Sequence, residues 1–517
     1  MLISLIEVTG VDASGAATVF RYSDGLGYRH PSAPGPYEPR LIQPCTIHRA
    51  MFGLGTTSGA TTEDYGAVII ANIDGGADQL KSYGFDGQPF RWLLVDDAAA
   101  YSTAVVALAC RMGKPTFNWG QIQLALRSWR SLFSIQIGVG HYGGTGGLEG
   151  SSSLTGQVRQ RAFGRCYRVP CTVVDTTLNI FQVSDGPISD LLATYLGGVG
   201  LTRGADYGSQ VALQDAAQSP ATGQYRVWPA GGYGRLAAEP TANLYADVDG
   251  DATGGVWAST TADVFKRLAD IYAPSHPTIP AADLSALNTA APGVIGLLVT
   301  SDATLSDLFD QLAVGAGCWW GMDAQEQLRI GRFGVLTGAP VATFTRVQIG
   351  NPATTTTGDI IEIDFDTTAD AGDGTPPYRV EVSYAQSYTV VTFSDGTSAA
   401  STDERNFVAR QFRTASAQDL TIKSKHAESD IFAKVSLYAA KGDADTEAAR
   451  ELALRKVDRD NLIITVKINA TLAAVLDLGA VVTVQIPRYG YDAGKAMLIR
   501  EIEVDARLMT AKLWLWG

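Results

Sequence analysis

The sequence closes on Thr510-Ala-Lys-Leu-Trp-Leu-Trp-Gly517, and this stretch decides the fold class. Its residues alternate as in a β-strand, with the lysine and both tryptophans on one face and the two leucines on the other. Large aromatic side chains gain little in a frayed end, so we expect this strand to be held in a sheet or a subunit contact. The stretch therefore indicates an assembly component and not a free-standing catalyst.

Composition predicts a mainly β chain with several domains. The 517 residues exceed what one core supports, and 46% are apolar against 18% charged, which allows sizeable cores. Turn signals are frequent, and the apolar runs are short and β-branched. The net charge of −13 argues against a surface that grips nucleic acid, although an acidic wall would let DNA slide past without binding.

Four segments are predicted: an N-terminal β-domain (1–165), a second β-domain (166–246), an α+β insert (247–335) and a C-terminal β segment with one helix (336–517). Strands in the two β-domains are predicted at 1–7, 65–75, 90–95, 171–175, 179–183 and 224–228. Short helical turns are expected at 78–83 and 187–192. Segment 116–129 fits strand or helix, and the glycine-, serine- and threonine-rich segment 138–156 is expected to be a surface loop or a mobile excursion.

Two helices are predicted in the insert. Thr260 is a candidate N-cap with Asp263 three residues on, and Thr304 precedes Asp307 in the same way. Apolar residues then recur at helical spacing behind each cap. A hairpin is expected at 318–330, so the insert should be two helices on a small sheet.

The last third is predicted to return to β structure. Strands are expected at 359–366, 378–384, 388–393, 462–468, 480–486, 496–504 and the terminal run. One helix, rich in alanine, glutamate, leucine and arginine, is expected to open at Asp443 or Asp445 and to run to about residue 457.

Neither disulfides nor membrane segments are indicated. Five cysteines are scattered along the chain: Cys45, Cys110, Cys166, Cys171 and Cys318. Cys166 and Cys171 are close in sequence, but no second cysteine pair or histidine cluster accompanies them. We therefore expect all five to be buried, reduced thiols of a chain folded in a cytoplasm. The longest apolar stretches, such as 291–300, are too short to span a bilayer. The first residues carry no basic segment and no cleavage site.

Two motifs fail for lack of context. Residues 138–143 match G-x-G-x-x-G, but the glycine run after them cannot form the helix that would hold a pyrophosphate. Asp247-Val-Asp-Gly-Asp251 has calcium-like spacing, yet Ala252 and Ala258 stand where an EF-hand loop needs glycine and glutamate. We interpret this second stretch as a solvated acidic turn at a domain junction.

No catalytic, cofactor-binding or metal-binding residue is assigned. The histidines are far apart: His30, His48, His141, His276 and His426. Neither H-E-x-x-H nor G-x-S-x-G occurs, and 53–59 lacks the spacing of a nucleophile elbow. A spatial Cys/His pair, or paired carboxylates for glycoside hydrolysis, would leave little trace in sequence. Aromatic residues that could stack on sugars are more typical of cores or subunit contacts: Trp228, Tyr233, Trp319 and Trp320.

Motifs spread from residue 64 to the chain end carry a family resemblance. In order they are 64–75, Tyr83-Gly-Phe-Asp-Gly87, Gly231-Gly-Tyr-Gly-Arg-Leu236, Ala246-Asp-Val-Asp-Gly250, Gly317-Cys-Trp-Trp-Gly321, Glu404-Arg-Asn-Phe407, Ala448-Ala-Arg450, Leu478-Gly-Ala-Val-Val482, Arg488-Tyr-Gly490 and the closing Leu-Trp-Gly. Each is short, and their order is what counts. The chain resembles the central tail-tip or baseplate hub proteins of long-tailed bacteriophages and gene transfer agents.

The resemblance implies a homotrimeric ring with two tube-like β-barrels per subunit, which gives a pseudo-sixfold collar on the hexameric tail tube. A small α+β domain would be inserted between barrel strands, so each barrel would draw on early and late parts of the chain. Such a hub has no enzymatic role and no cofactor. It caps the tube, adapts sixfold to threefold symmetry, binds the tube or a distal tail protein, and anchors tip, fibre or spike proteins.

The implied location is the tail tip of a virion that is assembled in the host cytoplasm, without direct membrane insertion. Genomic DNA would pass through the ring without specific binding. Two alternatives remain open: a tail-borne enzyme that degrades glycans, and a receptor-binding tip protein with segment 138–156 as its candidate feature. A fibre would be expected to show repeats, and none is evident.

Overall fold

The terminal residues form an interior strand, as the sequence predicts. The computed structural model describes residues 2–53, 56–134, 136–137, 140–334, 336, 338–346, 359–366, 375–392, 399–457 and 459–517. In it, β32 (Thr510–Trp516) lies between β31 (Lys495–Asp505) and β29 (Asn461–Lys467). The two leucines of β32 belong to one core, and Trp516, which is 3% exposed, belongs to another. The chain end is thus held from both faces.

The C-terminal sheet has the order β24-β30-β31-β32-β29-β25. Its remaining elements are β24 (Ala342–Thr345), β25 (Ile360–Phe365), β30 (Val481–Gln485) and the helix α9 (Ala470–Val475). These strands confirm the predictions at 359–366, 462–468, 480–486 and 496–504. The two outer strands approach each other, because the Thr345 hydroxyl donates to the Asp359 carboxylate at 3.2 Å.

The N-terminal sheet is built from strands within residues 2–43 and 67–127. Its order is β2-β1-β8-β9-β11-β7-β3, with β10 paired to β11. The bounds are β1 Leu2–Val11, β2 Ala17–Ser23, β3 Leu41–Gln43, β7 Ala67–Ala71, β8 Pro89–Asp96, β9 Val105–Met112, β10 Thr116–Phe117 and β11 Gln121–Arg127. Backbone bonds join its two ends, since Ser23 N donates to Glu38 O at 2.8 Å and Glu38 N to Arg21 O at 3.0 Å. Trp92 is fully buried in the core that the sheet encloses.

Several shorter predictions in this part are resolved. The turn expected at 78–83 is the 3-10 helix η1 (Asp78–Ser82), and the segment 116–129 contains strands and not a helix. A second 3-10 turn, η2 (Tyr101–Thr103), and the short helix α1 (Arg130–Phe133) complete this part.

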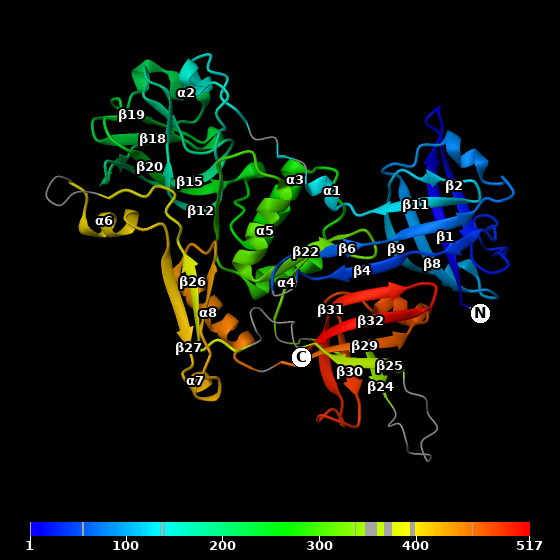
Figure 1. Cartoon of the computed structure of the whole chain (residues 1–517). Helices are drawn as coiled ribbons and strands as arrows, with labels where there is room; N and C mark the ends of the chain where they lie inside the picture. The colour runs from blue at the N-terminus through cyan, green and yellow to red at the C-terminus, as the bar shows by residue number, and fades with distance from the viewer. Residues whose placement is uncertain are drawn as a thin grey trace.

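Two early strands, β4 (Thr46–Ala50) and β6 (Thr62–Asp64), belong to the C-terminal sheet. The first half of β31 pairs with β30, and its second half, from Glu501 to Asp505, pairs with β4. β4 also pairs with β6, which leads into β7 of the N-terminal sheet. Figure 1 shows blue β4 beside red β31, with the two sheets one above the other. β4 and β6 therefore belong to a sheet whose other strands come from residues 342–516.

The second β-domain is two packed five-stranded sheets. Their orders are β16-β15-β20-β12-β21 and β13-β14-β19-β18-β17. The bounds are β12 Arg161–Pro170, β13 Thr172–Asp175, β14 Ile180–Gln182, β15 Ile188–Leu196, β16 Val199–Gly200, β17 Thr202–Arg203, β18 Gln224–Trp228, β19 Tyr233–Leu236, β20 Leu244–Asp251 and β21 Gly296–Val299. Val227 of one sheet and Val248 of the other share a core.

One prediction in this domain is wrong, and another is confirmed. Segment 187–192 is not a helical turn but the start of β15, because its pairing with β20 overrides the weak local signal. Segment 138–156, in its described part, is a mostly exposed loop, as predicted, and Tyr142 anchors it, because this residue is 3% exposed and packs with Tyr207 and Tyr233. Short elements cover this end of the domain: η3 (Gly147–Glu149), η4 (Ser152–Leu154), α2 (Gln210–Gln214), η5 (Ala216–Gln218) and η6 (Pro229–Gly231).

The α+β part contains the two capped helices that the sequence predicts. α3 (Thr261–Tyr272) begins after Thr260 and α5 (Leu305–Ala316) after Thr304, each with a complete capping box. A third helix, α4 (Ala281–Ala290), follows Pro280 without a side-chain cap. The predicted hairpin is β22 (Cys318–Met322) with β23 (Leu328–Arg332), and β5 (Gly59–Ala60) adds a parallel strand. The 3-10 turn η7 (Thr253–Gly255) leads into this part.

A small sheet with a helix on one face completes the chain. Its order is β27-β26-β28, and α8 packs on it. The bounds are β26 Arg379–Tyr384, α6 Thr402–Val408, β27 Arg413–Gln418, α7 Thr421–Lys425, β28 Ile431–Val435 and α8 Lys441–Arg455. The strand predicted at 388–393 does not form over 388–392, where Tyr388 turns inward and donates to Gly296 O. Phe393 lies outside the described residues.

The chain is therefore mainly β with several sheets, as its composition predicts. In the described residues neither large sheet closes through a complete strand pairing. Across the same residues, no helix is long and apolar enough to cross a membrane.

Candidate functional site

The acidic stretch Asp247–Asp251 is a buried strand and not a solvated turn, so that interpretation is wrong. Asp247, Asp249 and Asp251 alternate along β20 and share one face. Each is at most 8% exposed and pairs with an arginine of the neighbouring strand β12. The pairs are Arg168 with Asp247, Arg165 with Asp249 at 2.7 Å, and Arg161 with Asp251 at 2.5 Å.

This ladder leaves the carboxylates little capacity for a cation. Arg165 binds both oxygens of Asp249, at 2.7 and 2.8 Å, and Arg267 adds a second guanidinium to Asp251. Carboxylate oxygens that accept bidentate bonds from arginine are not available as calcium ligands. Among the residues that the structure describes, no cluster of three or more histidine, cysteine, aspartate or glutamate side chains could hold a metal ion.

Arg168 also fixes a distant helix. Its guanidinium donates to both oxygens of Glu404 in α6, at 2.9 and 2.6 Å, and lies 4.3 Å from the ring centres of Tyr195 and Phe407. Its φ of 53° is unusual for a residue with a side chain, and it falls at a bulge of β12. Burial raises the pKa of Asp247, against the pull of Arg168. The arrangement is a buried clamp between α6 and the second β-domain.

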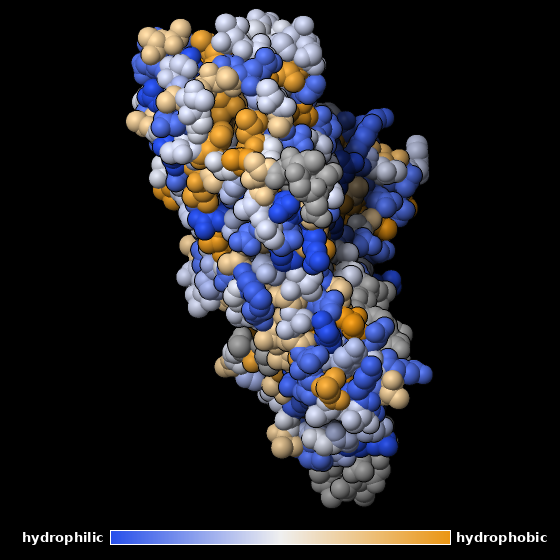
Figure 2. Space-filling model, turned by 90° about the vertical axis from the view of Figure 1, so that its left-hand side faces the viewer, coloured by the Kyte–Doolittle hydropathy of each residue, from blue (hydrophilic) through white to orange (hydrophobic). Residues whose placement is uncertain are grey.

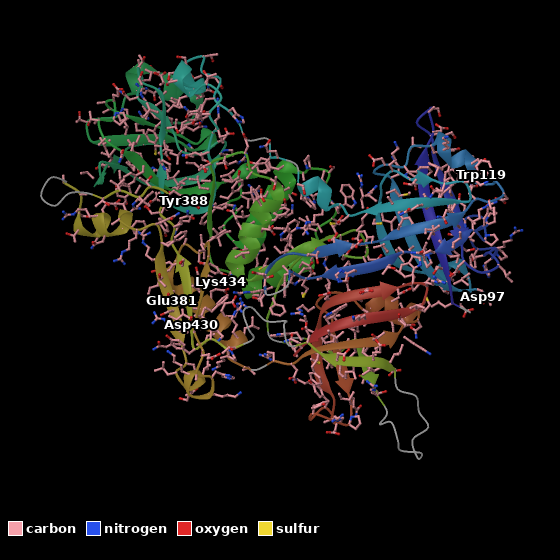
Figure 3. The ribbon with its side chains drawn as sticks, viewed as in Figure 1. Asp97, Trp119, Glu381, Tyr388, Asp430 and Lys434 are labelled. Carbon is pink, nitrogen blue, oxygen red and sulfur yellow. The ribbon has the colours of Figure 1, made fainter. Side chains whose placement is uncertain are left out.

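A second charge cluster lies under α8. Glu447 and Glu451 are 0% and 2% exposed. They share four cations from three elements: Arg332 of β23, Lys434 of β28, and Arg450 and Arg455 of α8. Burial alone would raise the pKa of Glu451, but Lys434, Arg450 and Arg455 hold it at about 2. The cluster thus ties the α+β part to the small sheet, and Figure 3 shows Lys434 between them.

The histidines lie in separate places. His48 meets Glu501 at 2.7 Å, His141 meets Asp302 at 3.5 Å, and His276 meets Asp270 at 3.1 Å. His30 bonds to the nearby Ser32, and His426 ends α7. These contacts give no shared histidine site.

The cysteines are free thiols. Four of them are buried, as predicted, and Cys171 is half-buried. Burial raises the pKa of Cys45, Cys166 and Cys318 to about 12. Thiols with such pKa values are protonated at neutral pH and are poor nucleophiles.

The remaining sequence candidates serve packing. Trp320 is 1% exposed in the core of the α+β part, and Tyr233 is 5% exposed and stacked on Trp228 at 6.0 Å. Trp319 is half-buried. Of the dinucleotide-like motif, Gly138 and Val139 lie outside the described residues, and the segment after it forms the short turn η3 and no α-helix.

Sequence reasoning missed an exposed apolar rim on the N-terminal sheet. Trp119 is 95% exposed and Ile73 is 84% exposed, on adjacent turns joined by a bond from Asn72 N to Gly120 O at 2.9 Å. The turn of Ile73 is rigid, because the Asn72 side chain accepts from Ala77 N at 2.8 Å. Figure 3 shows Trp119 at the outer end of the sheet. The sequence did contain a signal for this exposure, because a tryptophan stands within the Asn-Trp-Gly turn at 118–120.

The C-terminal sheet carries a second exposed apolar rim. Phe365 and Tyr489 are 42% and 66% exposed, and their ring centres are 5.1 Å apart. Ile361, on the same strand β25, is 44% exposed. Elsewhere, Leu192 and Val199 of the β15–β16 edge are each 40% exposed. Figure 2 shows apolar side chains gathered on the upper part of the face that it views. Exposed aromatic side chains are typical of protein contact surfaces.

No family model matches this chain, and no curated protein matches its sequence. Solved structures do resemble it. A tail protein from Neisseria meningitidis MC58 is 9% identical with a TM-score of 0.44, over 100% of this chain and 96% of that one. The 43 kDa tail protein of prophage MuSo2 from Shewanella oneidensis is 9% identical with a TM-score of 0.41, over 99% and 98%. A chain of the virion of a native gene transfer agent is 13% identical with a TM-score of 0.42, over 70% and 84%. In structure, this chain is similar to tail and virion proteins.

Proposed function

We propose that the chain is a structural tail protein that acts as the trimeric hub of a phage or gene-transfer-agent tail tip. The observation that carries this proposal is the pairing of β4 with β31, which places residues 46–50 and 501–505 in one sheet. The sequence resemblance leads to the expectation that tube-forming units draw on early and late parts of the chain. The C-terminal sheet has that composition.

In this proposal the two large sheets are the two tube-forming units of each subunit. The N-terminal sheet already meets itself at Ser23 and Glu38, and the outer strands of the C-terminal sheet approach at Thr345 and Asp359. Three subunits would then supply six such units around one axis, matching a sixfold tube while keeping threefold symmetry. A closed ring also covers strand edges that would otherwise pair with other chains.

The chemistry of the chain suits a structural role. The described acidic clusters are neutralised by arginine and lysine, and serve to hold segments together. The exposed rims at Trp119 and at Phe365 are candidate contacts for a neighbouring copy, the tail tube or a distal tail protein, and tip, fibre or spike proteins. The net charge of −13 suits a channel that DNA leaves without being bound. We propose domains that follow the four predicted segments, except that β4 and β6 join the C-terminal sheet and that β20 and β21 join the second β-domain.

Two measurements test the proposal. Native mass spectrometry of the purified 54.7 kDa chain should give a species of three copies, and electron microscopy should show a ring with threefold symmetry. Density for this chain should lie on the axis at the tail end of purified particles. A stable monomer in solution, together with particles whose tail axis lacks the chain, would contradict the hub function.

A further inference from the structure

Five aspartates in the described residues are followed directly by glycine, and such a pair can react with itself. The glycine amide nitrogen attacks the side-chain carbonyl carbon of the aspartate, because glycine has no side chain to block the approach. The reaction needs an amide N–H without a hydrogen bond, open space, and a carboxyl group that can lose an oxygen as water. Two further Asp-Gly pairs, at 373–374 and 395–396, lie outside the described residues. The described pairs begin at Asp24, Asp74, Asp86, Asp185 and Asp249.

Backbone pairing restrains the glycine in three of these pairs. Gly75 N donates to Asn72 O at 3.2 Å, and Gly87 N donates to Met112 O at 2.8 Å. Gly250 lies inside β20, which is paired with β12 on one side and with β15 on the other. A backbone N–H that is bonded to a carbonyl is not free to turn toward the preceding side chain.

The carboxylates of two of these pairs are occupied as well. Arg40 donates to both oxygens of Asp74, at 2.7 and 2.9 Å, and Arg165 to both oxygens of Asp249, at 2.7 and 2.8 Å. The hydrogen bonds from Arg40 lower the pKa of Asp74. This carboxylate therefore stays ionised and has no hydroxyl group to lose.

The pair at Asp185 is restrained in a different way. Gly186 precedes Pro187, whose ring restricts the backbone of the residue before it. The carbonyl oxygen of Gly186 also lies close to Gly232. Four of the five pairs are thus held in ways that oppose the reaction.

The pair Asp24–Gly25 lacks these restraints. Gly25 is exposed, and its N–H has no hydrogen-bond partner among the described residues. Its φ is 64°, and the open space around its Cα leaves room for a small ring. Leu26 is 100% exposed, and Gly27 has a φ of 94°. The turn therefore projects into solvent, where water can accept the proton of the Gly25 amide.

The Asp24 carboxyl group is held at the base of this turn. Its Oδ1 accepts a hydrogen bond from Ser4 N at 2.9 Å. Burial raises the pKa of Asp24, so a larger fraction of this group is neutral at a given pH than of an exposed aspartate. The neutral group can lose Oδ2 as water, and the Ser4 N–H stabilises the negative charge that develops on Oδ1 during the attack.

We propose that Asp24–Gly25 is a site of spontaneous isomerisation of aspartate to isoaspartate. The Gly25 nitrogen gives up its proton and bonds to Cγ of Asp24, while the Oδ2 hydroxyl takes up a proton and leaves as water, which closes a succinimide ring. Water then opens the ring. Opening at Cγ restores aspartate, and opening at the main-chain carbonyl carbon gives isoaspartate, whose backbone runs through the former side chain. No oxidant or cofactor takes part, and the proposal does not depend on the hub function.

The change is expected to loosen the edge of the N-terminal sheet. Ser4 N donates to Asp24 Oδ1 at 2.9 Å and Asp24 N donates to Ser4 O at 3.2 Å, which extends the pairing of β1 with β2 past Ser23. Isoaspartate places an additional methylene group in the backbone and moves the acceptor away from Ser4. Tyr28, which is 1% exposed, anchors the chain just after the turn. Hydrogen exchange of Ser4 and of residues 24–27 should therefore speed up in the isomerised chain.

The test uses the full chain, aged in near-neutral buffer at physiological temperature and then digested. Mass spectrometry with electron-transfer fragmentation distinguishes isoaspartate from aspartate in each peptide. We expect isoaspartate to accumulate at Asp24 about tenfold faster than at Asp74, Asp86 or Asp249, where a hydrogen bond must first break. Asp185 should also react more slowly than Asp24. In urea the five pairs should react at similar rates, because the fold no longer distinguishes them.

Two variants and a matched control complete the test. Gly25→Ala should slow the isomerisation several-fold, because its methyl group hinders the attack, and Asp24→Glu should abolish it, because the larger ring closes far more slowly. Gly15→Ala is the control, since Gly15 has a similar φ of 88° and open space around its Cα but does not follow an aspartate. It should leave the rate at Asp24 unchanged.

Thermal unfolding of each variant shows that it is folded. Absence of isoaspartate at Asp24, or equal rates at Asp24 and at the restrained pairs in the folded chain, overturns the proposal. The same preference for Asp24 in urea also overturns it, because the fold would then play no part.

Discussion

Arg168 and Glu404, 236 positions apart in the sequence, form a buried ion pair with two hydrogen bonds, Nε to Oε1 at 2.9 Å and Nη2 to Oε2 at 2.6 Å. Tyr245 adds a third bond to the same carboxylate at 3.0 Å. The pair fixes α6 on the second β-domain, because both partners are at most 7% exposed and the aromatic rings around them exclude water.

Glu404→Ala is expected to destabilise this junction by about 3–5 kcal/mol, because Arg168 would stay buried with one carboxylate fewer. Hydrogen exchange of residues 399–413 should speed up in the variant while exchange in the N-terminal sheet stays unchanged. Glu428→Ala, which removes an exposed glutamate of the same part of the chain, is the control. Unchanged exchange in α6 would show that the clamp does not hold it.

Calcium is expected to have no effect on stability, because the carboxylates of Asp247–Asp251 are engaged by arginines. Thermal unfolding should be the same with a chelator and with millimolar calcium. Asp249→Ala should lower stability by about 1–3 kcal/mol in either condition, since it leaves Arg165 without its two acceptors. A calcium-dependent rise in the melting temperature would contradict this assignment.

The cluster under α8 is expected to make the fold acid-sensitive. Burial opposes ionisation of Glu447 and Glu451, yet the surrounding cations lower both pKa values, that of Glu451 to about 2. Their folded pKa values lie below the ordinary value of 4.5, so their stabilisation is complete above about pH 4.5 and is lost as the pH falls toward 2.

Glu451→Gln should remove the part of the acid-induced loss of stability that protonation of Glu451 causes. The free energy of unfolding of α8 can be measured in urea by hydrogen exchange at several pH values. As the pH falls, this free energy should decrease less steeply in the variant than in the unchanged chain. The control variant Glu428→Gln should show the same dependence of the unfolding free energy on pH as the unchanged chain. Parallel slopes for Glu451→Gln and the unchanged chain would disprove the role of this carboxylate.

The two capping boxes are expected to contribute comparable amounts. Thr260→Ala and Thr304→Ala should each cost about 1 kcal/mol, because the first-turn N–H of Asp263 or Asp307 loses its acceptor. Thr304→Ser keeps the acceptor and should restore nearly all of it. Exchange protection of the first turns of α3 and α5 measures the effect, and equal protection in the alanine and serine variants would contradict it.

Removal of residues 510–517 is expected to prevent folding of the C-terminal sheet, because β31 and β29 would both lose their neighbour. The truncated chain should lose soluble expression or the near-ultraviolet signal of its packed tryptophans. Lys512→Ala, at an exposed position of the same strand, should be close to neutral. A soluble truncated chain with unchanged secondary structure would show that the strand is dispensable.

Local signals explain what the sequence could predict. The capping boxes at Thr260 and Thr304, the hairpin at 318–330 and the alternation of the terminal strand each depend on residues a few positions apart. Their physical cause is contained in the stretch itself. The exposure of Trp119 also had a local signal, since it stands in a turn between two strands.

The failures share a different cause. Asp247–Asp251 looks like a hydrophilic turn until β12 supplies Arg161, Arg165 and Arg168 as partners. Segment 187–192 becomes a strand because β20 lies beside it, and Tyr388 turns inward to reach Gly296. In each case the deciding partner is distant in sequence, and one sequence alone does not pair them.

One half of β31 pairs with β30 and the other half with β4. The pairing with β4 has a consequence for how the protein is made. β4 leaves the ribosome long before its partner, since residues 50 and 501 pair across nearly the whole chain. At about 5–20 residues per second, roughly 20–90 seconds of translation separate the two strands. During that interval the β4 edge lacks the β31 ladder. Nascent-chain binding by chaperones is therefore expected to concentrate on residues 46–64 and to end when the last fifty residues emerge.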